Sequence, residues 1–338
     1  MAELIDKRKG AKKRNRLAVV LGGTGFIGSN LVERLKNEGW YVIAADINPE
    51  KGDPNITKAD EFYKVDLRDK DACLKVIPFE ADRVYQLAAD MGGAGYIFTG
   101  DHDAAVMTNS VLVNLNVAMA CTIMKVKKIF WSSSACAYPE DIQMDPNNAG
   151  LKEEYAYPAN PDSEYGWEKL FSERLWLAYN RNEGLDVRIA RFHNIYGPLS
   201  AYSTSRAKAP AAISYKVLTN KDKVQIWGDG KQTRSFLYIE DCLDAIERLM
   251  TSETFRGPVN IGSEEIISIG DFTRMIMDIC DSEAEVENIE GPQGVRGRNS
   301  NNNLIKKELG WSPNYTLRDG IEELIQWIRY DMNRIFSE

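Results

Sequence analysis

A tyrosine and a lysine four residues apart form the pair in this chain best suited to acid–base chemistry. Tyr165 and Lys169, in the segment EYGWEK, share one face if that segment is helical. A free tyrosine titrates near ~10, and a nearby ammonium favours its phenolate form. Ser134 ends an apolar run upstream, where its hydroxyl can hydrogen-bond the same substrate alcohol. The three residues therefore predict removal of a proton from an alcohol.

A glycine-rich turn indicates where a matching hydride acceptor would bind. The segment LAVVLGGTGFIGSNLVERL has the order strand, turn and amphipathic helix. Gly22, Gly25 and Gly28 allow a tight turn, close approach of the backbone to phosphate oxygens and close packing of helix on strand. The helix would begin at Phe26 and Ile27, whose free N–H groups suit a pyrophosphate. The segment predicts a dinucleotide site.

An acid at the end of the second apolar run favours NAD as the dinucleotide. Asp46 lies about 20 residues beyond the glycines, where a carboxylate accepts hydrogen bonds from the adenosine ribose and would repel a 2′-phosphate. The alternative is that Asp46 only opens a turn with residues 48–49. Asp66, Leu67 and Ala88 are expected to be adenine-side or backbone contacts, although each also fits ordinary strand-end chemistry. The positive nicotinamide ring would further favour the tyrosine phenolate.

Short apolar runs alternate with amphipathic segments in the first part of the chain. This alternation is typical of parallel strands joined by crossover helices. The runs cover residues 17–22, 41–46, 83–89, 128–134 and 187–192. The predicted fold is α/β, with a doubly wound parallel Rossmann sheet and a second, smaller mixed α/β substrate domain.

The pattern becomes more looped after the last of these runs, with Gly197-Pro198 and Gly291-Pro292 as turn signals. The segment FLYIEDCLDAIERLM again has a strand end followed by a helix, so the chain is expected to return to the first domain there. The expected bounds are 1–190 for the NAD-binding Rossmann domain, with 225–255 returning to it, and 191–224 with 256–338 for the substrate domain.

Composition argues against several classes of function. A net charge of −8 disfavours a general nucleic-acid binder, since such proteins rely on clustered positive charge. Five spaced cysteines without a CxxC pair, and only two histidines, suggest neither a disulfide framework nor a metal centre. No uninterrupted apolar run reaches the ~18 residues of a membrane span, and basic residues 7–16 are interpreted as a solvated arm. We therefore expect a cytoplasmic protein with no metal, nucleic-acid or membrane partner.

The chain resembles the extended short-chain dehydrogenases in several motifs. They are GGTGFIG, SSSAC, YGWEK and RFHNIYGP, together with Asp46. In that family hydride removal produces a ketone, and further acid–base groups decide the fate of that ketone. Cys136 lies two residues beyond Ser134, and nearby positive charge activates a thiol of ordinary pKa about 8.5. Lys208, in RAKAPAA, is the candidate to face it across the substrate. Taken separately, such a cysteine is more often a buried small hydrophobe and such a lysine solvated.

An opposed thiolate and ammonium suit a double epimerisation. A sugar with a ketone at C4 has acidified C–H bonds at C3 and C5, so one group can remove a proton and the other return it on the opposite face. Longer motifs are similar to those of GDP-mannose 3,5-epimerases, from the first strand to the final helices. They are SSSACAYPE, ADMGGAGYI, RFHNIYGP, KAPAA, WGDGKQTRSF and VRGRNSNNNLIKKELGW.

This resemblance implies conversion of GDP-mannose to GDP-L-galactose, with GDP-L-gulose as the 5-epimer, and NAD that is reduced and reoxidised in each turnover. It implies redox roles for Tyr165 and Lys169, and proton exchange by Cys136 and Lys208. It also motivates a homodimer formed through two long helices, expected near 104–125 and 163–182.

Further residues are expected to bind the sugar nucleotide by the same resemblance. They are Gly93, in the sugar pocket, and Asn194, Lys208, Lys216, Gln232, Arg234 and Arg298. A loop or surface role is the alternative for each of them. His193 is interpreted as a packed, satisfied histidine without a catalytic role.

Two segments depart from the family pattern. Ala137 follows the cysteine where a bulkier aliphatic residue is common, and residues 200–206, SAYSTSR, lack the expected glycines. They leave open the preferred sugar and whether C3, C5 or both are inverted.

Other functions on the same scaffold remain open. One alternative is another nucleotide-sugar 4-epimerase, dehydratase or 4-dehydrogenase, and a second is a non-catalytic NAD-binding scaffold. A dehydratase has an Asp-Glu pair where this chain has Ala135-Cys136. A simple 4-epimerase leaves Cys136 and Lys208 unexplained.

Overall fold

The computed structural model describes residues 16–47, 58–147, 150–292 and 294–335. Its centre is a seven-stranded sheet in the order β11-β6-β5-β4-β1-β2-β3, with parallel pairing throughout. The strands are β1 (Leu17–Leu21), β2 (Tyr41–Asp46), β3 (Glu61–Lys64), β4 (Arg83–Gln86), β5 (Lys128–Ser134), β6 (Val187–Phe192) and β11 (Val259–Ile261). The strand order reverses between β1 and β4, which confirms the predicted doubly wound sheet.

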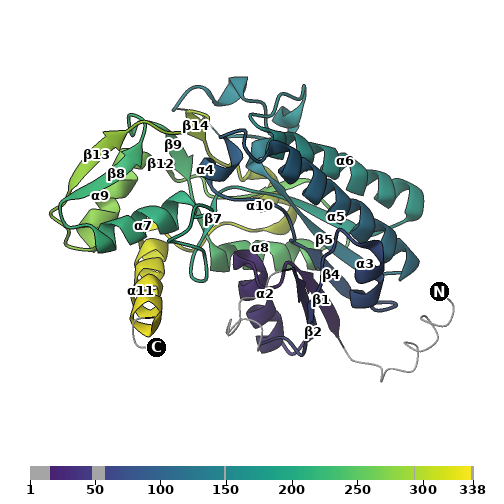
Figure 1. Ribbon diagram of the computed structural model, residues 1–338. Helices are drawn as coiled ribbons and strands as arrows, with labels where there is room; N and C mark the ends of the chain where they lie inside the picture. Colours follow the sequence, from purple (N-terminus) through teal and green to yellow (C-terminus); the bar gives the residue numbers. More distant parts are fainter. Residues whose placement is uncertain (1–15, 48–57, 148–149, 293, 336–338) are drawn as a thin grey trace.

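Helices cover both faces of this sheet (Figure 1). Helices α2 (Phe26–Asn37) and α8 (Ile239–Thr251) pack on one face, and α3 (Lys70–Val76), α5 (Asp103–Ile123) and α6 (Glu164–Glu183) on the other. Along β1, Ala18 and Val20 enter the first of these cores, whereas Val19 and Leu21 enter the second. This alternation follows from the two-residue period of a strand, and explains why the strands of a sheet covered on both faces are apolar throughout.

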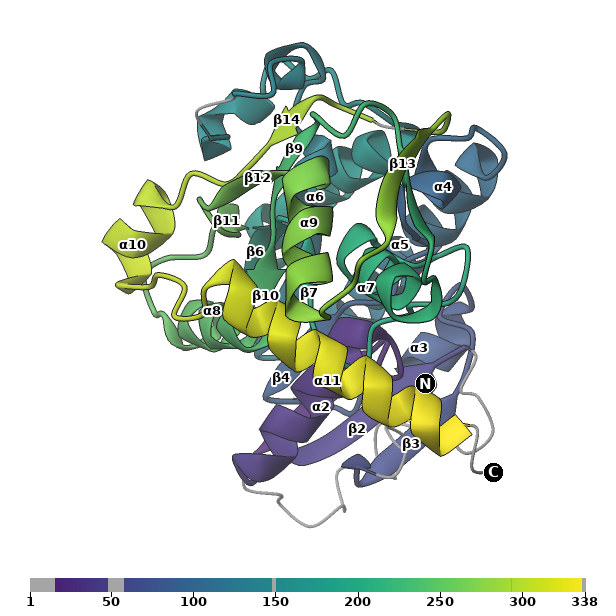
Figure 2. The same cartoon turned by 90° about the vertical axis from the view of Figure 1, so that its left-hand side faces the viewer.

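A smaller lobe is formed by the later part of the chain, and α11 (Leu317–Ile335) crosses its surface (Figure 2). It contains a parallel pair of strands, a three-stranded sheet and several helices. They are β8 (Lys223–Trp227) with β13 (Glu285–Ile289), β12 (Ile266–Ser268) with β9 (Thr233–Ser235) and β14 (Gly297–Arg298), and α7 (Ala209–Thr219), α9 (Ile269–Ile279) and α10 (Asn303–Leu309). The predicted second, smaller mixed domain is thus present.

The chain passes between the two lobes more than once. The returning helix is α8, but β8 and β9 at 223–235 belong to the smaller lobe, and β11 at 259–261 joins the large sheet. The strand β11 pairs with β6 through backbone hydrogen bonds, and three residues are too few to be recognised as a strand in the sequence. The expected domain bounds stay a prediction. Short elements complete the chain: β7 (Ile195–Tyr196), β10 (Leu237–Tyr238), α4 (Ala94–Ile97), η2 (Ala135–Ala137), η3 (Asp141–Gln143) and η4 (Glu153–Ala156).

Helix α6, which carries the tyrosine and lysine, has clear start and stop signals. Ser163 is its N-cap and accepts a hydrogen bond from the Gly166 amide at 3.2 Å between Oγ and N. Gly184 ends the helix with a φ of 71°, the left-handed conformation that glycine adopts without cost. The helix therefore begins at Glu164, one residue before Tyr165, which places the Tyr165 side chain in its first turn.

Helix α5 is long and apolar enough, by length and composition, to cross a membrane. Uninterrupted apolar runs in the sequence do not reveal it, because polar residues divide its apolar stretches. A core helix of a soluble protein meets the same criterion, and Val106, Val113 and Val117 of α5 are buried inside this fold. The absence of a membrane partner therefore stays a prediction.

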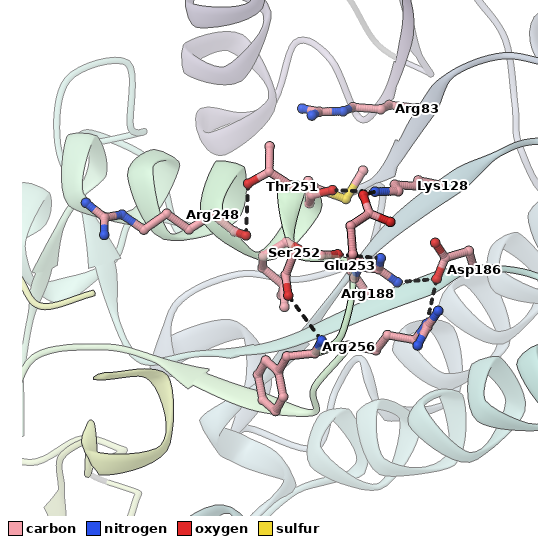
Figure 3. Close-up of polar contacts among 12 residues, drawn as sticks. Arg83, Lys128, Asp186, Arg188, Arg248, Thr251, Ser252, Glu253 and Arg256 are labelled. Carbon is pink, nitrogen blue, oxygen red and sulfur yellow. Dashed lines mark hydrogen bonds and ion pairs between the residues drawn. The ribbon is translucent and has the colours of Figure 1, made fainter. Parts of the chain in front are cut away.

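The amino ends of the sheet strands carry a network of charged side chains (Figure 3). Arg188 in β6 is completely buried, and pairs with Asp186. Its Nε donates to the Leu249 carbonyl at 3.2 Å and its NH2 group to the Ser252 carbonyl at 2.8 Å. Carbonyls at the end of a helix lack intrahelical partners. Arg188 therefore caps the carboxyl end of α8 and fastens it to the sheet.

Candidate active site

The glycine-rich turn between β1 and α2 fits a bound dinucleotide in its backbone. Gly22 has a φ of +79°, and a Cβ there would lie 2.8 Å from the amide nitrogen of Ala88. A Cβ at Gly28 would lie 2.0 Å from the Gly22 carbonyl oxygen. The turn is thus closed to larger residues. Gly25 caps α2, so Phe26 and Ile27 form its first turn, as predicted.

Asp46 stands at the end of β2 and contacts this turn directly. Its Oδ2 accepts a hydrogen bond from the Thr24 amide at 3.2 Å, and its Oδ1 accepts one from Ile47 at 2.8 Å. The carboxylate thus helps to shape the glycine-rich turn and stands where the ribose is expected. Residues 48–49, invoked in the alternative turn interpretation, lie outside the described residues.

The adenine-side candidates have structural partners of their own. Asp66 forms an ion pair with Arg68 at 2.6 Å between Oδ2 and NH2, and the hydrogen bonds from Arg68 lower the pKa of Asp66. Leu67 is buried in the core, and its carbonyl accepts a hydrogen bond from the Cys73 thiol at 3.2 Å. The Ala88 amide donates to the side chain of the residue two before it. Each is therefore fixed in place by the chain itself.

Tyr165, Lys169 and Ser134 meet at the carboxyl end of β5. Tyr165 is buried and hydrogen-bonded to Ser134. The Lys169 Nζ lies 5.5 Å from the centre of the Tyr165 ring and donates to the Ser132 carbonyl at 3.1 Å. It also lies 5.1 Å from the centre of the Trp131 ring. The predicted trio is thus assembled from one strand end and one helix turn.

Burial controls the protonation of this trio in a way that the sequence did not suggest. It raises the pKa of Tyr165, and nearby Cys136 and Glu168 add to the effect, while the hydrogen bond from Ser134 and the charge of Arg298 oppose it. Burial likewise lowers the pKa of the Lys169 ammonium. The chain alone therefore holds the phenol neutral, because desolvation disfavours both charged forms. The expected phenolate requires further positive charge from a bound cofactor.

Arg298 lies directly beside the Cys136 thiol. Its NH1 group is 3.1 Å from Cys136 Sγ, and its NH2 group pairs with Asp162 Oδ2 at 2.6 Å. Its Nε donates to Gln143 Oε1 at 2.6 Å. These contacts use all three guanidinium nitrogens of a side chain that is only 5% exposed. Arg298 was predicted only as a sugar-nucleotide ligand, and its contact with the thiol, as well as Asp162 and Gln143, went unrecognised.

Lys208 approaches the same thiol from the smaller lobe. It is the N-cap residue of α7, followed by Pro210 in the first turn. Burial lowers the pKa of Lys208, and the charge of Lys169 acts in the same direction, while Cys136 opposes the shift. The Lys208 ammonium thus interacts electrostatically with both Lys169 and Cys136. The structure therefore brings together Ser134, Cys136, Tyr165 and Lys169 through direct contacts, and Lys208 interacts electrostatically with Cys136 and Lys169.

A second arginine, half-buried, lies near Arg298. Arg234 donates from NH1 to the Thr233 carbonyl and from NH2 to the Val295 carbonyl, each at 2.7 Å. Burial and the charge of Arg298 lower the pKa of Arg234 to about 9. A guanidinium group whose charge is disfavoured by burial and by a neighbouring arginine suits an anionic ligand, because an anion would stabilise that charge.

Three other predicted ligands make contacts within the smaller lobe. Asn194 Nδ2 donates to the Ser235 carbonyl at 2.9 Å, and Lys216 Nζ to the Gln225 carbonyl at 2.8 Å. Gln232 Nε2 donates to the Trp227 carbonyl at 2.9 Å. The Gln232 Oε1 is buried without a hydrogen-bond partner in the part of the chain that the structure describes. It is therefore the atom of these three side chains that most needs a ligand donor.

His193 is buried, as expected, but is only half satisfied. Its Nε2 lies 2.9 Å from Asn260 Oδ1, whereas Nδ1 has no partner among the described residues. Burial, together with the charges of Arg298 and Arg191, lowers the pKa of His193 to about 3. The interpretation as a fully satisfied histidine is therefore wrong, because sequence patterns do not count partners for each ring nitrogen.

Known proteins resemble this chain in sequence and in fold. The GDP-mannose 3,5-epimerase of Arabidopsis thaliana is 44% identical over 315 residues, which are 93% of this chain and 82% of that protein. The UDP-glucose 4-epimerase of Thermotoga maritima, solved with UDP-glucose, has a TM-score of 0.84 at 25% identity and covers 94% of this chain and 99% of its own.

A third similar protein was solved with a dinucleotide. The UDP-glucuronic acid 4-epimerase of Bacillus cereus, in complex with UDP-glucuronic acid and NAD, has a TM-score of 0.79 at 27% identity and covers 93% of this chain and 99% of its own. The NAD dependent epimerase/dehydratase family model matches residues 18–262. The resemblance inferred from the motifs is thus confirmed: the chain belongs to the NAD dependent epimerase/dehydratase family.

Proposed function

We propose that this chain is a GDP-mannose 3,5-epimerase, which converts GDP-mannose to GDP-L-galactose and forms GDP-L-gulose as the 5-epimer. The observation that carries the proposal is the position of Cys136 and Lys208 beside the Tyr165–Lys169 pair. The 44% identity to a protein of that name supports it. Redox and proton-exchange groups on one sugar are what epimerisation beside a transient ketone requires.

NAD is the cofactor, and the residues of the first lobe fit it. The glycine-rich turn is tightly folded directly before the first turn of α2, whose free N–H groups suit a pyrophosphate, and Asp46 at the end of β2 is the candidate acceptor for the ribose. When bound, NAD accepts a hydride from the sugar and returns it within one turnover. The hydrogen bond to the Ser132 carbonyl holds the Lys169 ammonium 5.5 Å from the centre of the Tyr165 ring. Tyr165 takes the proton of the sugar 4-hydroxyl, with Ser134 bonded to the same oxygen.

Proton exchange at C3 and C5 then falls to the thiol and the ammonium. A ketone at C4 makes the neighbouring C–H bonds acidic, and one of the two groups removes a proton while the other delivers one to the opposite face. Arg298 NH1, which lies 3.1 Å from Cys136 Sγ, holds the thiol in place at the site. Burial lowers the pKa of Lys208, which makes its ammonium a better proton donor.

The nucleotide end of the substrate is proposed to bind between the lobes. Arg234 is half-buried and lies close to the buried Arg298, and this pair of cations suits the charge of a diphosphate. The unpartnered Oε1 of Gln232 is an acceptor for a base or ribose donor. Asn194 and Lys216 are assigned to the same pocket by resemblance alone, since their polar atoms contact backbone carbonyls.

A 4-epimerase on the same scaffold is the second candidate, and the similarity in fold to the Thermotoga maritima 4-epimerase favours it. It would use Tyr165 and Lys169 alone. It gives no role to a thiol held against a buried arginine. A non-catalytic NAD-binding scaffold would bind NAD without converting any sugar.

Assembly and location are part of the same proposal. Three large apolar side chains stay exposed on α5 and α6: Leu112, Trp167 and Phe171, at 40%, 40% and 49%. Because α5 packs against α6, these residues lie on neighbouring helices, and a homodimer formed through both helices would bury them. Light scattering that shows only monomers would remove the dimer. A cytoplasmic location also stays a proposal.

The first experiment is incubation of purified protein with GDP-mannose in heavy water, followed by mass spectrometry and proton NMR of the sugar. The proposed function predicts deuterium at C3 and C5 together with galactose- and gulose-configured products. Inversion at C4 without exchange at C3 or C5 would establish the 4-epimerase instead. NAD binding without conversion of GDP-mannose or a panel of other nucleotide sugars would favour the scaffold.

A further inference from the structure

The loop that precedes Lys208 is fastened to the first lobe by one arginine. The Arg206 NH2 group donates to the Tyr96 hydroxyl at 3.0 Å, and its NH1 group donates to the Met91 carbonyl at 3.2 Å. NH1 also pairs with Asp90 Oδ1 at 3.3 Å. The guanidinium carbon lies 4.2 Å from the centre of the Tyr96 ring. One side chain thus makes four different contacts across the boundary between the lobes.

The backbone on both sides of Arg206 fits the same surface. The Gly93 amide donates to the Arg206 carbonyl at 3.1 Å, and a Cβ at Gly93 would lie 2.3 Å from the Ala207 carbonyl oxygen. A side chain at Gly93 would therefore push the loop away. Gly93 was expected to line the sugar pocket, and the structure gives it this packing role next to Lys208.

The surface that receives Arg206 is itself held in place. The Tyr96 hydroxyl donates to Asp90 Oδ1 at 2.9 Å, and Asn109 Nδ2 donates to Asp90 Oδ2 at 2.8 Å. The Asp90 amide donates to the Ser110 hydroxyl at 3.2 Å. Asn109 and Ser110 belong to α5, a long helix of the first lobe. The acceptor for Arg206 is therefore anchored to a rigid element and not to another loop.

We propose that Arg206 is a positioning residue that holds Lys208 opposite Cys136 by latching the smaller lobe onto Asp90 and Tyr96. Lys208 follows two residues later and opens α7, so displacement of the loop moves the base of its side chain. Tyr165 and Lys169 are held by β5 and α6 and do not depend on the latch. Loss of the latch should then impair proton exchange more than redox chemistry, a distinction that rests on the proposed function.

The test compares Arg206→Ala and Arg206→Lys with an arginine variant far from the latch. Arg206 is 52% exposed, so its removal costs little stability. Arg318→Ala is the matched control, because Arg318 is a similarly exposed arginine that pairs with Asp278. The expected result for Arg206→Ala is a roughly 10- to 100-fold lower kcat for epimerisation, the penalty of a displaced acid–base group. Reduction of bound NAD on mixing with GDP-mannose, followed by absorbance, should keep its rate.

The Arg206→Lys variant keeps a positive charge that can pair with Asp90, but it lacks the guanidinium group that also donates hydrogen bonds to Tyr96 and Met91. It should therefore recover part of the lost kcat, whereas Arg318→Ala should match the unmodified protein. Equal epimerisation by Arg206→Ala and the control, or an equal loss of NAD reduction and epimerisation, would overturn the latch.

A second readout does not depend on turnover. Amine-reactive labelling of Lys208, measured by peptide mass spectrometry, should become several-fold faster in Arg206→Ala and in Tyr96→Phe, because a released loop exposes the ammonium. Unchanged labelling in both variants would overturn the latch even in an active enzyme. If the unmodified protein does not convert GDP-mannose, the proposed function fails, and labelling alone still decides the latch.

Discussion

Two buried arginines lie at opposite ends of the strands of the parallel sheet, one at the amino edge and one at the carboxyl edge. They show how differently the same residue type is used. Arg188 lies at the amino ends of the strands and Arg298 near the carboxyl end of β5, and neither exposes more than 5% of its side chain. Each is paired with one aspartate, Asp186 or Asp162. Burial and pairing therefore do not distinguish a structural arginine from one in an active site.

The remaining partners make the difference. Arg188 satisfies two carbonyls at the end of α8, which would otherwise lack partners. Arg298 instead contacts the side chains of Gln143 and Cys136, and the thiol is a group that can change its protonation. The function of a buried cation is thus indicated by the chemistry of the groups that it contacts. Arg298 also lies at the carboxyl ends of the strands, where open α/β sheets bind ligands.

The largest expected effect comes from removing the thiol at the carboxyl edge. Cys136→Ser should lower deuterium exchange at C3 and C5 by about 10²- to 10⁴-fold, the usual contribution of one acid–base group. The midpoint of thermal unfolding and the bound NAD should stay unchanged. The control is Cys280→Ser, which alters a half-buried thiol of the smaller lobe. Exchange at the normal rate in Cys136→Ser would show that the thiol beside Arg298 is not part of the chemistry.

The next effect tests the amino edge. Arg188→Met leaves two carbonyls at the end of α8 without donors and should lower the free energy of unfolding by about 3 kcal/mol in urea titration. The rate of conversion per folded molecule should not change. Lys127→Met, which removes an ion pair with Asp82 from a side chain that is 58% exposed, should stay within about 0.5 kcal/mol. A lower rate of conversion per folded molecule in Arg188→Met would contradict a purely structural role for Arg188.

Acid should also separate the two ends of the sheet, because each loses stability at a different pH. The pKa of His193, at the carboxyl edge, falls from 6.5 to about 3 through burial and nearby arginines. A lowered pKa means that the unfolded chain binds the proton first, so stability is complete above pH 6.5 and falls below it, by about 1 kcal/mol per pH unit.

The amino edge should respond only at lower pH. Burial tends to raise the pKa of Asp186, but hydrogen bonds from Arg256 and Arg188 outweigh it and bring the pKa below 3.8. Its contribution is therefore present above pH 3.8 and lost below that value. Urea titration from pH 7 to 4 should show a decline in the unmodified protein and a flatter profile in His193→Gln. Equal slopes in both proteins would contradict the assignment of the early decline to His193.

Much of the fold could be predicted because it depends on local pattern. The apolar runs at 41–46 and 128–134 coincide with β2 and β5, and the helix expected at 163–182 is α6 at 164–183. A strand covered on both faces must be apolar along its whole length, and a helix needs a cap, here Ser163. The short strand β11 was missed because three residues carry too little pattern.

The sequence by itself determined the chemical inventory of the site: a phenol, an amine and a hydroxyl at the right spacing, a thiol, and a glycine-rich turn followed by an acid. These follow from residue type and near-neighbour spacing, which a sequence displays directly. Only the tertiary structure decided which groups touch. Arg298 reaches Cys136 across 162 positions of chain, Arg206 fastens the Lys208 loop to Asp90, and burial reverses the charge preference of Tyr165. Contacts between distant segments and loss of solvent arise from packing, which no local pattern encodes.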